Sequence, residues 1–207
     1  MTAIRLVLAT RRVVLLLGVV IVLSVLATVA AHGAIAIALS QVNPPHKIPD
    51  AELIALVTGI LAAGVLRPRF WEWDRLGAPR TRVVAGTTTI LGIAAPLIPV
   101  LAAATRLPDT VAWHPMLSNV LTLDGAVFIV GALLGPALGG GIVLVAYFAD
   151  AIIDNLARGA APYLPLADFP DTNALWLPAL ALPLVAIAIN TYNHGASTWA
   201  HRLTRNG

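Results

Sequence analysis

The chain has 207 residues, of which 58% are hydrophobic and 11% are charged, and its mean hydropathy is +0.86. Soluble domains contain about 25% charged residues, so this composition excludes a water-covered globular fold and indicates an integral membrane protein. The formal charge of +3 comes from basic residues that flank apolar segments, which indicates membrane topology rather than nucleic-acid binding. The chain contains no cysteine, which excludes disulfides, thiolate metal ligands and thiol catalysis.

The first apolar segment predicts a membrane-spanning helix over residues 12–38. Arg5, Arg11 and Arg12 precede it, as in a signal peptide, but the apolar run is far longer than the roughly 7–15 residues of a signal-peptide core. We therefore expect a retained helix that is tilted or that projects beyond the bilayer, because a span needs only about 20 residues. The proline-rich residues 41–50 are expected to form the loop that ends it.

The next two helices are predicted over residues 51–66 and 83–104, and Pro96 and Pro99 should kink the second of them. The loop between them, residues 67–82, holds the densest group of arginines in the chain, and short basic loops stay on the cytoplasmic side of a bilayer. This loop is either a short amphipathic element that docks on a cytoplasmic partner or a topological anchor at the lipid headgroups. Its two acids favour docking, because they would not help binding to anionic lipid. The candidate docking residues are Arg67, Arg69, Phe70, Trp71, Glu72, Trp73, Asp74 and Arg75.

Residues 120–156 form an apolar run that decides the topology. A single helix over it would be about 55 Å long, nearly twice the hydrocarbon thickness of about 30 Å. A glycine-rich stretch around Pro136 lies inside the run, so we predict two helices, over residues 119–135 and 137–157, joined by a tight turn. Gly131, Gly135 and Gly139 are spaced four apart, which is also compatible with a helix-packing face.

A final helix is predicted over residues 173–193, followed by a short basic tail. The predicted fold class is therefore all-α: one transmembrane domain over residues 1–207, a polytopic bundle of about six helices. With six spans and both termini in the cytoplasm, the only basic residues outside are Lys47, Arg106 and Arg158. The positive-inside rule weakly prefers this to five spans, which would place the C-terminal arginines outside.

Four ionisable residues inside the predicted spans are candidates for a transport path. His32 is expected deep in the first helix, where one hydrogen bond to a neutral ring is the alternative. Asp124 falls inside the fourth helix, and solvation near its outer end is about as plausible as a transport role. Asp150 and Asp154 share a face of the fifth helix, where interfacial solvation is favoured over a cation site. No metal site is predicted.

The sequence contains no HExxH, GxSxG or P-loop motif, and no catalytic residue is predicted. The layout, with a cytoplasmic loop at residues 67–82 and a tight turn between the fourth and fifth helices, resembles the ABC-2 type permeases, the membrane subunits of many bacterial ABC exporters. The resemblance implies that this loop docks on a separate ATPase chain, which would carry ATP and Mg²⁺, and that the permease works as a homodimer or with another membrane subunit. Residues 162–170 would correspond to the re-entrant stretch of that family.

Residues 134–139, Leu-Gly-Pro-Ala-Leu-Gly, are also similar to a stretch of the substrate-binding membrane subunits of energy-coupling-factor vitamin importers, which have this size and six spans. Three hypotheses follow: an exporter permease, a solute-binding importer subunit, and an accessory subunit of a larger membrane complex that needs no site. The composition, rich in Ala, Leu, Val, Arg and Pro, is typical of bacteria with GC-rich genomes. We therefore expect a multi-pass protein of the bacterial cytoplasmic membrane.

Overall fold

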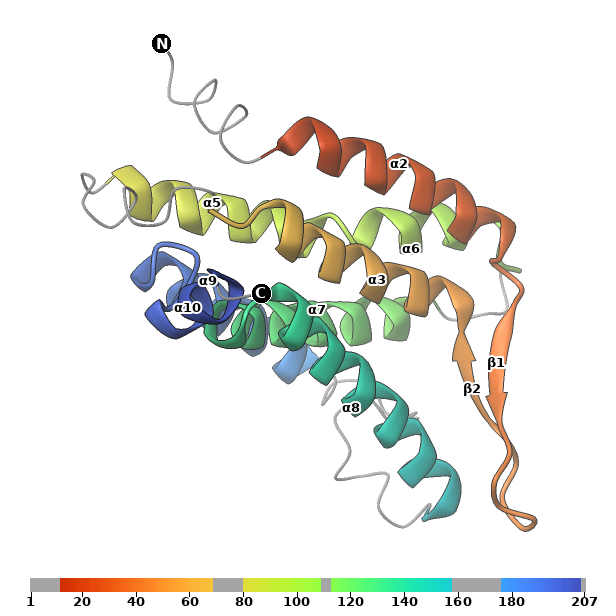
Figure 1. Ribbon diagram of the computed structural model, residues 1–207. Helices are drawn as coiled ribbons and strands as arrows, with labels where there is room; N and C mark the ends of the chain where they lie inside the picture. Colours follow the sequence, from red (N-terminus) through yellow and green to blue (C-terminus); the bar gives the residue numbers. More distant parts are fainter. Residues whose placement is uncertain (1–11, 69–79, 109–112, 158–175, 206–207) are drawn as a thin grey trace.

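The computed structural model describes residues 12–68, 80–108, 113–157 and 176–205. Their elements are, in chain order, α2 (Val13–Val29), β1 (Ala34–Ile37), β2 (His46–Pro49), α3 (Asp50–Val65), α5 (Arg80–Ala94), α6 (Leu97–Ala104), α7 (His114–Leu134), α8 (Pro136–Leu156), α9 (Trp176–Tyr192) and α10 (Thr198–Arg205). The predicted helical class is confirmed, because helices dominate the described residues and the two strands form a single hairpin (Figure 1).

Three helical segments in the described part of the chain are long and apolar enough to cross a membrane. They are Thr81–Ala104, which contains most of α5 and all of α6, His114–Leu134 and Pro136–Leu156. The helices α2 and α9 are apolar but shorter. These lengths agree with membrane association, since a helix of about 20 apolar residues matches the hydrocarbon core.

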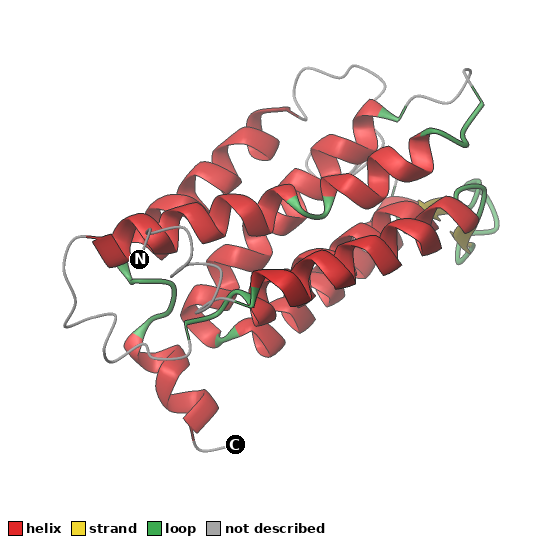
Figure 2. Cartoon of the chain, turned by 90° about the horizontal axis from the view of Figure 1, so that it is seen from above, coloured by secondary structure: helices red, strands yellow, loops and turns green. Residues whose placement is uncertain are grey.

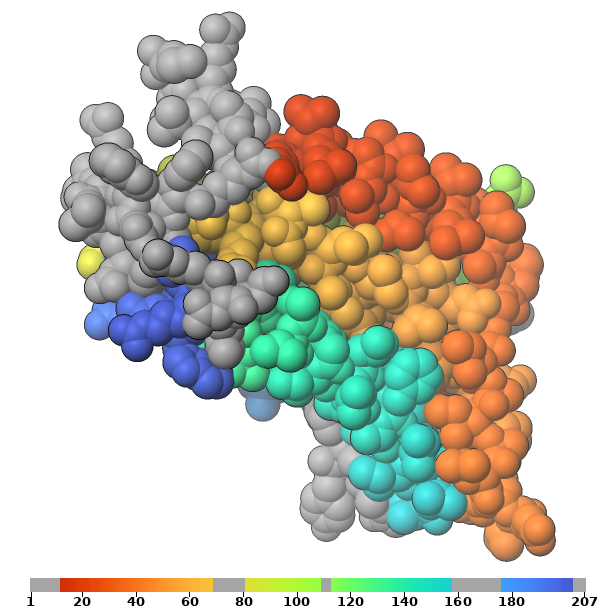
Figure 3. All heavy atoms as spheres, in the orientation of Figure 1, coloured from red at the N-terminus to blue at the C-terminus, as the bar shows by residue number. Residues whose placement is uncertain are grey.

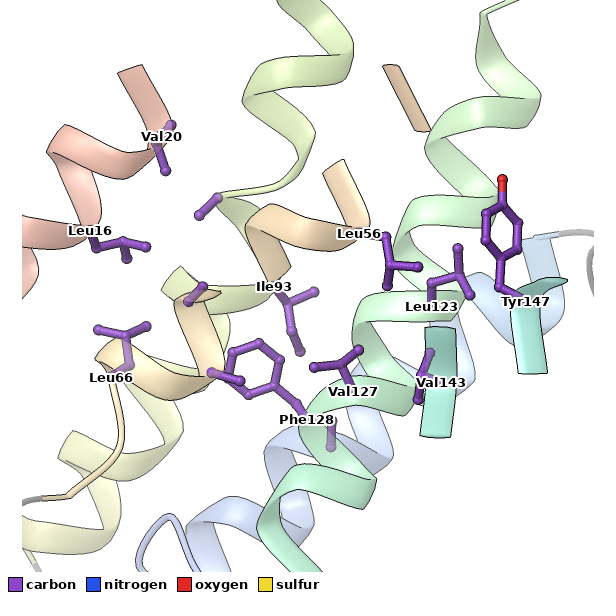
Figure 4. Packing of buried hydrophobic residues seen from close by; sticks show 14 of the residues in the cluster. Leu16, Val20, Leu56, Leu66, Ile93, Leu123, Val127, Phe128, Val143 and Tyr147 are labelled. Carbon is purple, nitrogen blue, oxygen red and sulfur yellow. The ribbon is translucent and has the colours of Figure 1, made fainter. Parts of the chain in front are cut away.

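The helix α7 lies at the centre of the bundle and packs against α3, α8 and α9 (Figure 1). Seen from above, the strands of the hairpin lie at one end of the helical bundle (Figure 2). The core that joins these helices includes Leu56 of α3, Val127 and Phe128 of α7, and Val143 of α8 (Figure 4). By contrast, α2 packs only against α3 and α6 among its stronger contacts, and most of its other side chains are exposed. An outward face of this composition suits contact with lipid.

The helix predicted over residues 12–38 is corrected by the structure, because α2 ends at Val29 and the chain then forms a hairpin. Ala34 pairs with Pro49 and Ile37 with His46 in an antiparallel register, so the proline-rich residues 41–50 provide the turn and the second strand. Gly33 makes the entry to the hairpin possible, since a Cβ there would overlap the carboxylate of Asp50. With 17 residues, α2 is about 25 Å long and does not need the tilt that a longer helix would require.

The helix predicted over residues 83–104 is divided by Pro96 into α5 and α6. Proline has no amide hydrogen and its ring disturbs the preceding turn, which explains the interruption. Pro99 lies inside the first turn of α6, where a missing amide hydrogen costs little. The last predicted helix, residues 173–193, is found as α9, and the basic tail forms the short helix α10, which the sequence analysis did not anticipate.

The turn between α7 and α8 is made by Gly135, whose φ of 94° and ψ of 152° suit a residue without a side chain. Pro136 follows as the first residue of α8, a position where its fixed φ favours the start of a helix. The two neighbouring glycines then face each other, since a Cβ added at Gly139 would lie 2.7 Å from the Cα of Gly131. The glycine spacing thus produces both the tight turn and a close helix contact.

This contact predicts that Gly139→Ala destabilises the protein, whereas Gly141→Ala on the same helix does not. Both substitutions raise helix propensity equally, but only the first places a methyl group against the backbone of α7, and a Cβ at Gly141 meets nothing within 4 Å. We expect Gly139→Ala to lower the free energy of unfolding by about 1–3 kcal/mol relative to Gly141→Ala. Unfolding of both variants in detergent micelles, followed by circular dichroism, measures the difference, and equal stabilities would contradict the packing.

Candidate functional site

Asp124 lies at the midpoint of α7, and its side chain is fully buried, with 0% exposed. Neither of its carboxylate oxygens has a hydrogen-bond partner within the described residues. The carboxylate lies against Gly59 of α3, where an added Cβ would overlap it, and Pro96 borders the same space. An ionisable side chain inside a candidate span is expensive and therefore a candidate for function.

The hydroxyl groups nearest to Asp124 and Gly59 in the sequence are already committed to the backbone of their own helices. Thr58 donates to the carbonyl of Ile54 at 2.8 Å, and Thr122 donates to the carbonyl of Ser118, also at 2.8 Å. This is the usual way for Ser and Thr to satisfy a hydroxyl inside a helix. These groups therefore do not compensate the Asp124 carboxylate.

A second group of buried polar side chains lies nearer to the hairpin, on α3 and α8. Glu52 is 3% exposed and Asp150 is 8% exposed. The Tyr147 hydroxyl, itself buried, donates a hydrogen bond to the Glu52 carboxylate, and Asp150 is close enough to interact electrostatically with Tyr147. Glu52 precedes Gly59 by two turns of α3, which is about 10 Å along the helix axis. Glu52 and Asp150 thus lie in the half of the bundle on the hairpin side.

The hairpin is fastened to the C-terminal end of α8 by Asn155, which is 2% exposed. Its side-chain oxygen accepts hydrogen bonds from the amides of Leu39 (2.9 Å) and Ser40 (3.0 Å), and its amide donates to the carbonyl of Pro44 (3.0 Å). Asn43 donates to the backbone carbonyl of Asn155 at 2.8 Å. Figure 3 shows the hairpin in direct contact with this end of α8.

Asp154, which lies on the same face of α8 as Asp150, also helps to hold the hairpin. Its carboxylate is 2.7 Å from Nδ1 of His46 on β2. The two aspartates therefore have different surroundings, one buried near Tyr147 and the other at the hairpin. His32 is corrected, because α2 ends at Val29 and leaves His32 exposed rather than deep in a helix. The described residues contain no group of three or more His, Cys, Asp or Glu side chains that could hold a metal ion.

Most of the predicted docking loop falls outside the described residues, including Arg69, Phe70, Trp71, Glu72, Trp73, Asp74 and Arg75. Arg67, at its start, donates a hydrogen bond to the carbonyl of Ala200 on α10 at 3.2 Å. Burial lowers the pKa of the Arg67 guanidinium from its ordinary value. Together with Thr88, Thr89 and Asn190, Arg67 lines a cavity of about 30 Å³ at this end of the bundle, large enough for about one water molecule.

Comparison with protein-family models, with characterised proteins and with solved structures finds no match to this chain. The fold and the site therefore define a class and nothing narrower: a mostly helical protein with helices able to cross a membrane and with acidic side chains buried among them. Glu52 was not predicted from the sequence. Its signal was a lone acid at the second position of the apolar segment of residues 51–66.

Because Asn155 holds the hairpin against α8, the substitution Asn155→Ala should make the hairpin open more easily. The substitution removes two acceptor contacts and one donor contact, so the free energy of opening the hairpin should fall by about 1–3 kcal/mol. The amides of Leu39 and Ser40 should then exchange with deuterium roughly 5- to 150-fold faster, as measured by mass spectrometry of peptides from the hairpin. The exposed neighbour Leu156→Ala serves as control and should leave these amides unchanged. Equal exchange in both variants would contradict the role of Asn155.

Proposed function

We propose that this chain is the membrane-spanning, solute-binding subunit of an ABC-type transporter in a bacterial cytoplasmic membrane, driven by an ATPase on a separate chain. The observation that carries the proposal is the burial of Glu52, Asp124 and Asp150 among apolar helices. Buried acids in membrane helices are rare and usually mark a path or a binding site. An accessory subunit without a site would have no use for them.

The proposal includes six spans: α2, α3, the α5–α6 pair, α7, α8 and α9. The start of α2, the end of α3, the start of α5 and the helix α10 lie towards the end of the bundle opposite the hairpin (Figure 1). These segments carry or adjoin Arg12, Arg67, Arg82 and Arg202. By the positive-inside rule that end faces the cytoplasm, with both termini, and the hairpin faces outward. The lengths of α3 and α9, 16 and 17 residues, are at the short limit for a span, which interfacial side chains and local thinning accommodate.

The solute-binding form is favoured over the exporter form by the position of the acids. Glu52, Tyr147 and Asp150 lie between the centre of the bundle and the hairpin, on the side from which an imported solute would arrive. The hairpin, fastened to α8 through Asn155, covers that end. Carboxylates and a tyrosine hydroxyl suit a solute that carries a positive charge, such as a protonated amine.

The cytoplasmic end provides a platform for the partner ATPase. Arg67 is anchored on α10, and Ser197, just before α10, donates to the carbonyls of Ala132 and Leu133 at the end of α7. A loop that starts from this anchored base could pass movement of the ATPase to α3, α5 and α7. The basic residues 67–82 would supply the contacts, in agreement with the docking interpretation of their sequence.

The proposal predicts a cysteine crosslink to an ATPase chain. The sequence has no native cysteine, so Ala78→Cys gives a single thiol in the loop and Val42→Cys gives one at the hairpin tip, where Val42 is 93% exposed. After mild purification with a thiol-reactive crosslinker, Ala78→Cys should be joined to a nucleotide-binding chain of about equal abundance, identified by mass spectrometry. Val42→Cys should not be joined to it.

Charge reversal tests the same contact. Arg69→Glu should reduce copurification of the ATPase by roughly tenfold or more, because a docked arginine contributes about 1–3 kcal/mol. Lys47→Glu, in the hairpin, is the matched control and should have no effect. Copurification of subunits of another membrane complex in place of an ATPase would contradict the proposal.

A further inference from the structure

Two of the helical segments that neighbour α7 carry a proline close to Asp124 or to the residue after it. Pro96 separates α5 from α6 and borders the space that the Asp124 carboxylate shares with Gly59. Pro183 lies inside α9, and a Cβ added to Gly125, the residue after Asp124, would lie 2.8 Å from its nitrogen. The buried carboxylate therefore lies beside the break between α5 and α6, and the next residue of α7 contacts the proline of α9. Discontinuous helices beside a buried charge are an arrangement that transporters use for coupling ions.

Each proline removes a hydrogen-bond donor and so leaves a carbonyl without its usual partner. An α-helix pairs the amide of each residue with the carbonyl four residues earlier, so the carbonyls of Gly92 and Ala179 receive no such bond from Pro96 and Pro183. At the break between α5 and α6, the amide of Ile98 donates a hydrogen bond to the carbonyl of Ala95 at 3.2 Å. Neither proline supplies a backbone donor, and no described group donates to either carboxylate oxygen of Asp124, which suits a proton or a cation and not an anion.

The titratable side chains on the helices packed against α7 do not supply a counter-charge. On α3 and α8 the described ones are acids and a tyrosine, namely Asp50, Glu52, Tyr147, Asp150 and Asp154. On α6 there are none, and on α9 there is Tyr192 at its end. Among the described arginines, Arg67 is about 12 Å from Gly59 along the helix axis, and Arg82 and Arg106 are about 21 Å and about 15 Å from Pro96. His201 and Arg202 lie on α10. A carboxylate buried without a counter-charge must be neutralised by a ligand.

We propose that Asp124 binds and releases a proton during the transport cycle. The proton comes from water, adds to a carboxylate oxygen of Asp124 when the helices close, and returns to water when they open. No other bond changes. The space around the carboxylate is filled by Gly59 and the Pro96 ring, which leaves no room for a metal ion and its several oxygen ligands. The inference rests on the proposed transport function and adds a coupling site distinct from the acids near Tyr147.

Infrared spectroscopy tests the proton directly on the full chain in lipid nanodiscs. A protonated carboxylic acid has a carbonyl band that carboxylates lack, and the band shifts in D₂O once the proton has exchanged. We expect the spectrum of the wild-type protein minus that of Asp124→Asn to contain one such band. It should weaken as the pH is raised from about 5 to about 9, a range that brackets near-neutral proton exchange, and it should shift in D₂O.

The controls separate Asp124 from the other acids and proton from sodium. Asp154→Asn, at the hairpin, should keep the band of Asp124. If Asp124→Asn does not fold, the D₂O shift of a pH-dependent band in the wild-type protein, retained in Glu52→Gln and in Asp150→Asn, still decides the question. A band that neither shifts in D₂O nor changes with pH would overturn the proposal, because Asp124 would then be permanently neutral.

Two further results would also overturn the proton assignment. The first is the absence of any acid band that depends on Asp124. The second is loss of the band when choline chloride is replaced by sodium chloride at constant pH, since sodium would then be the ligand. None of these results depends on an ATPase partner. Failure of the crosslinking experiment and failure of this one are therefore distinguishable.

Discussion

Close backbone contact along α7 is the constraint on which the rest of the bundle depends. Helices in lipid gain little from hydrophobic burial and associate through close packing, which small residues permit. Gly125 lies against α9, Gly131 against Gly139 of α8, and Gly59 of α3 against Asp124. Side chains at these glycines would push α7 away from each neighbour in turn. The same closeness buries the Asp124 carboxylate completely, in a site that only a small ligand could enter.

The two ends of the bundle differ in the contacts that hold them and in the charge of their side chains. At one end the hairpin is fastened to α8 through Asn155 and through the contact between His46 and Asp154. At the other end α10 is held by Arg67 and by the bonds of Ser197 to the end of α7. Acids are buried on the hairpin side and arginines gather on the other. Under the proposed function, one end would receive the solute and the other would respond to the ATPase, with Asp124 between them.

The sequence predicted those features that depend on local pattern. Apolar length located the helices, and the glycines beside Pro136 located the turn at Gly135. The hairpin could not be predicted, because Ala34–Ile37 is as apolar as the helix before it and a short apolar run does not distinguish helix from strand. The helix α10 was missed for a related reason, since eight residues that mix basic, polar and apolar side chains predict a tail unless their tertiary contacts are known.

The site was only partly predictable. Asp124 was a candidate from its position in an apolar run, but its lack of partners depends on Gly59 and Pro96, which are distant in sequence. Asp150 and Asp154 share a helix face, yet only Asp154 contacts the hairpin, so the sequence could not separate their roles. Glu52 became a candidate only when Tyr147 was found beside it.

Under the proposed function, Asp124 is retained for proton binding and not for stability, and one comparison tests this most directly. The free energy of unfolding of Asp124→Asn should equal or exceed that of the wild-type protein, because the substitution removes an acid that has no partner. Asn190→Ala should instead cost about 1–3 kcal/mol, since Asn190 donates to the carbonyls of Ala186 (2.8 Å) and Phe128 (3.2 Å). A loss of several kcal/mol in Asp124→Asn would contradict the account, because Asp124 would then be part of the structural core.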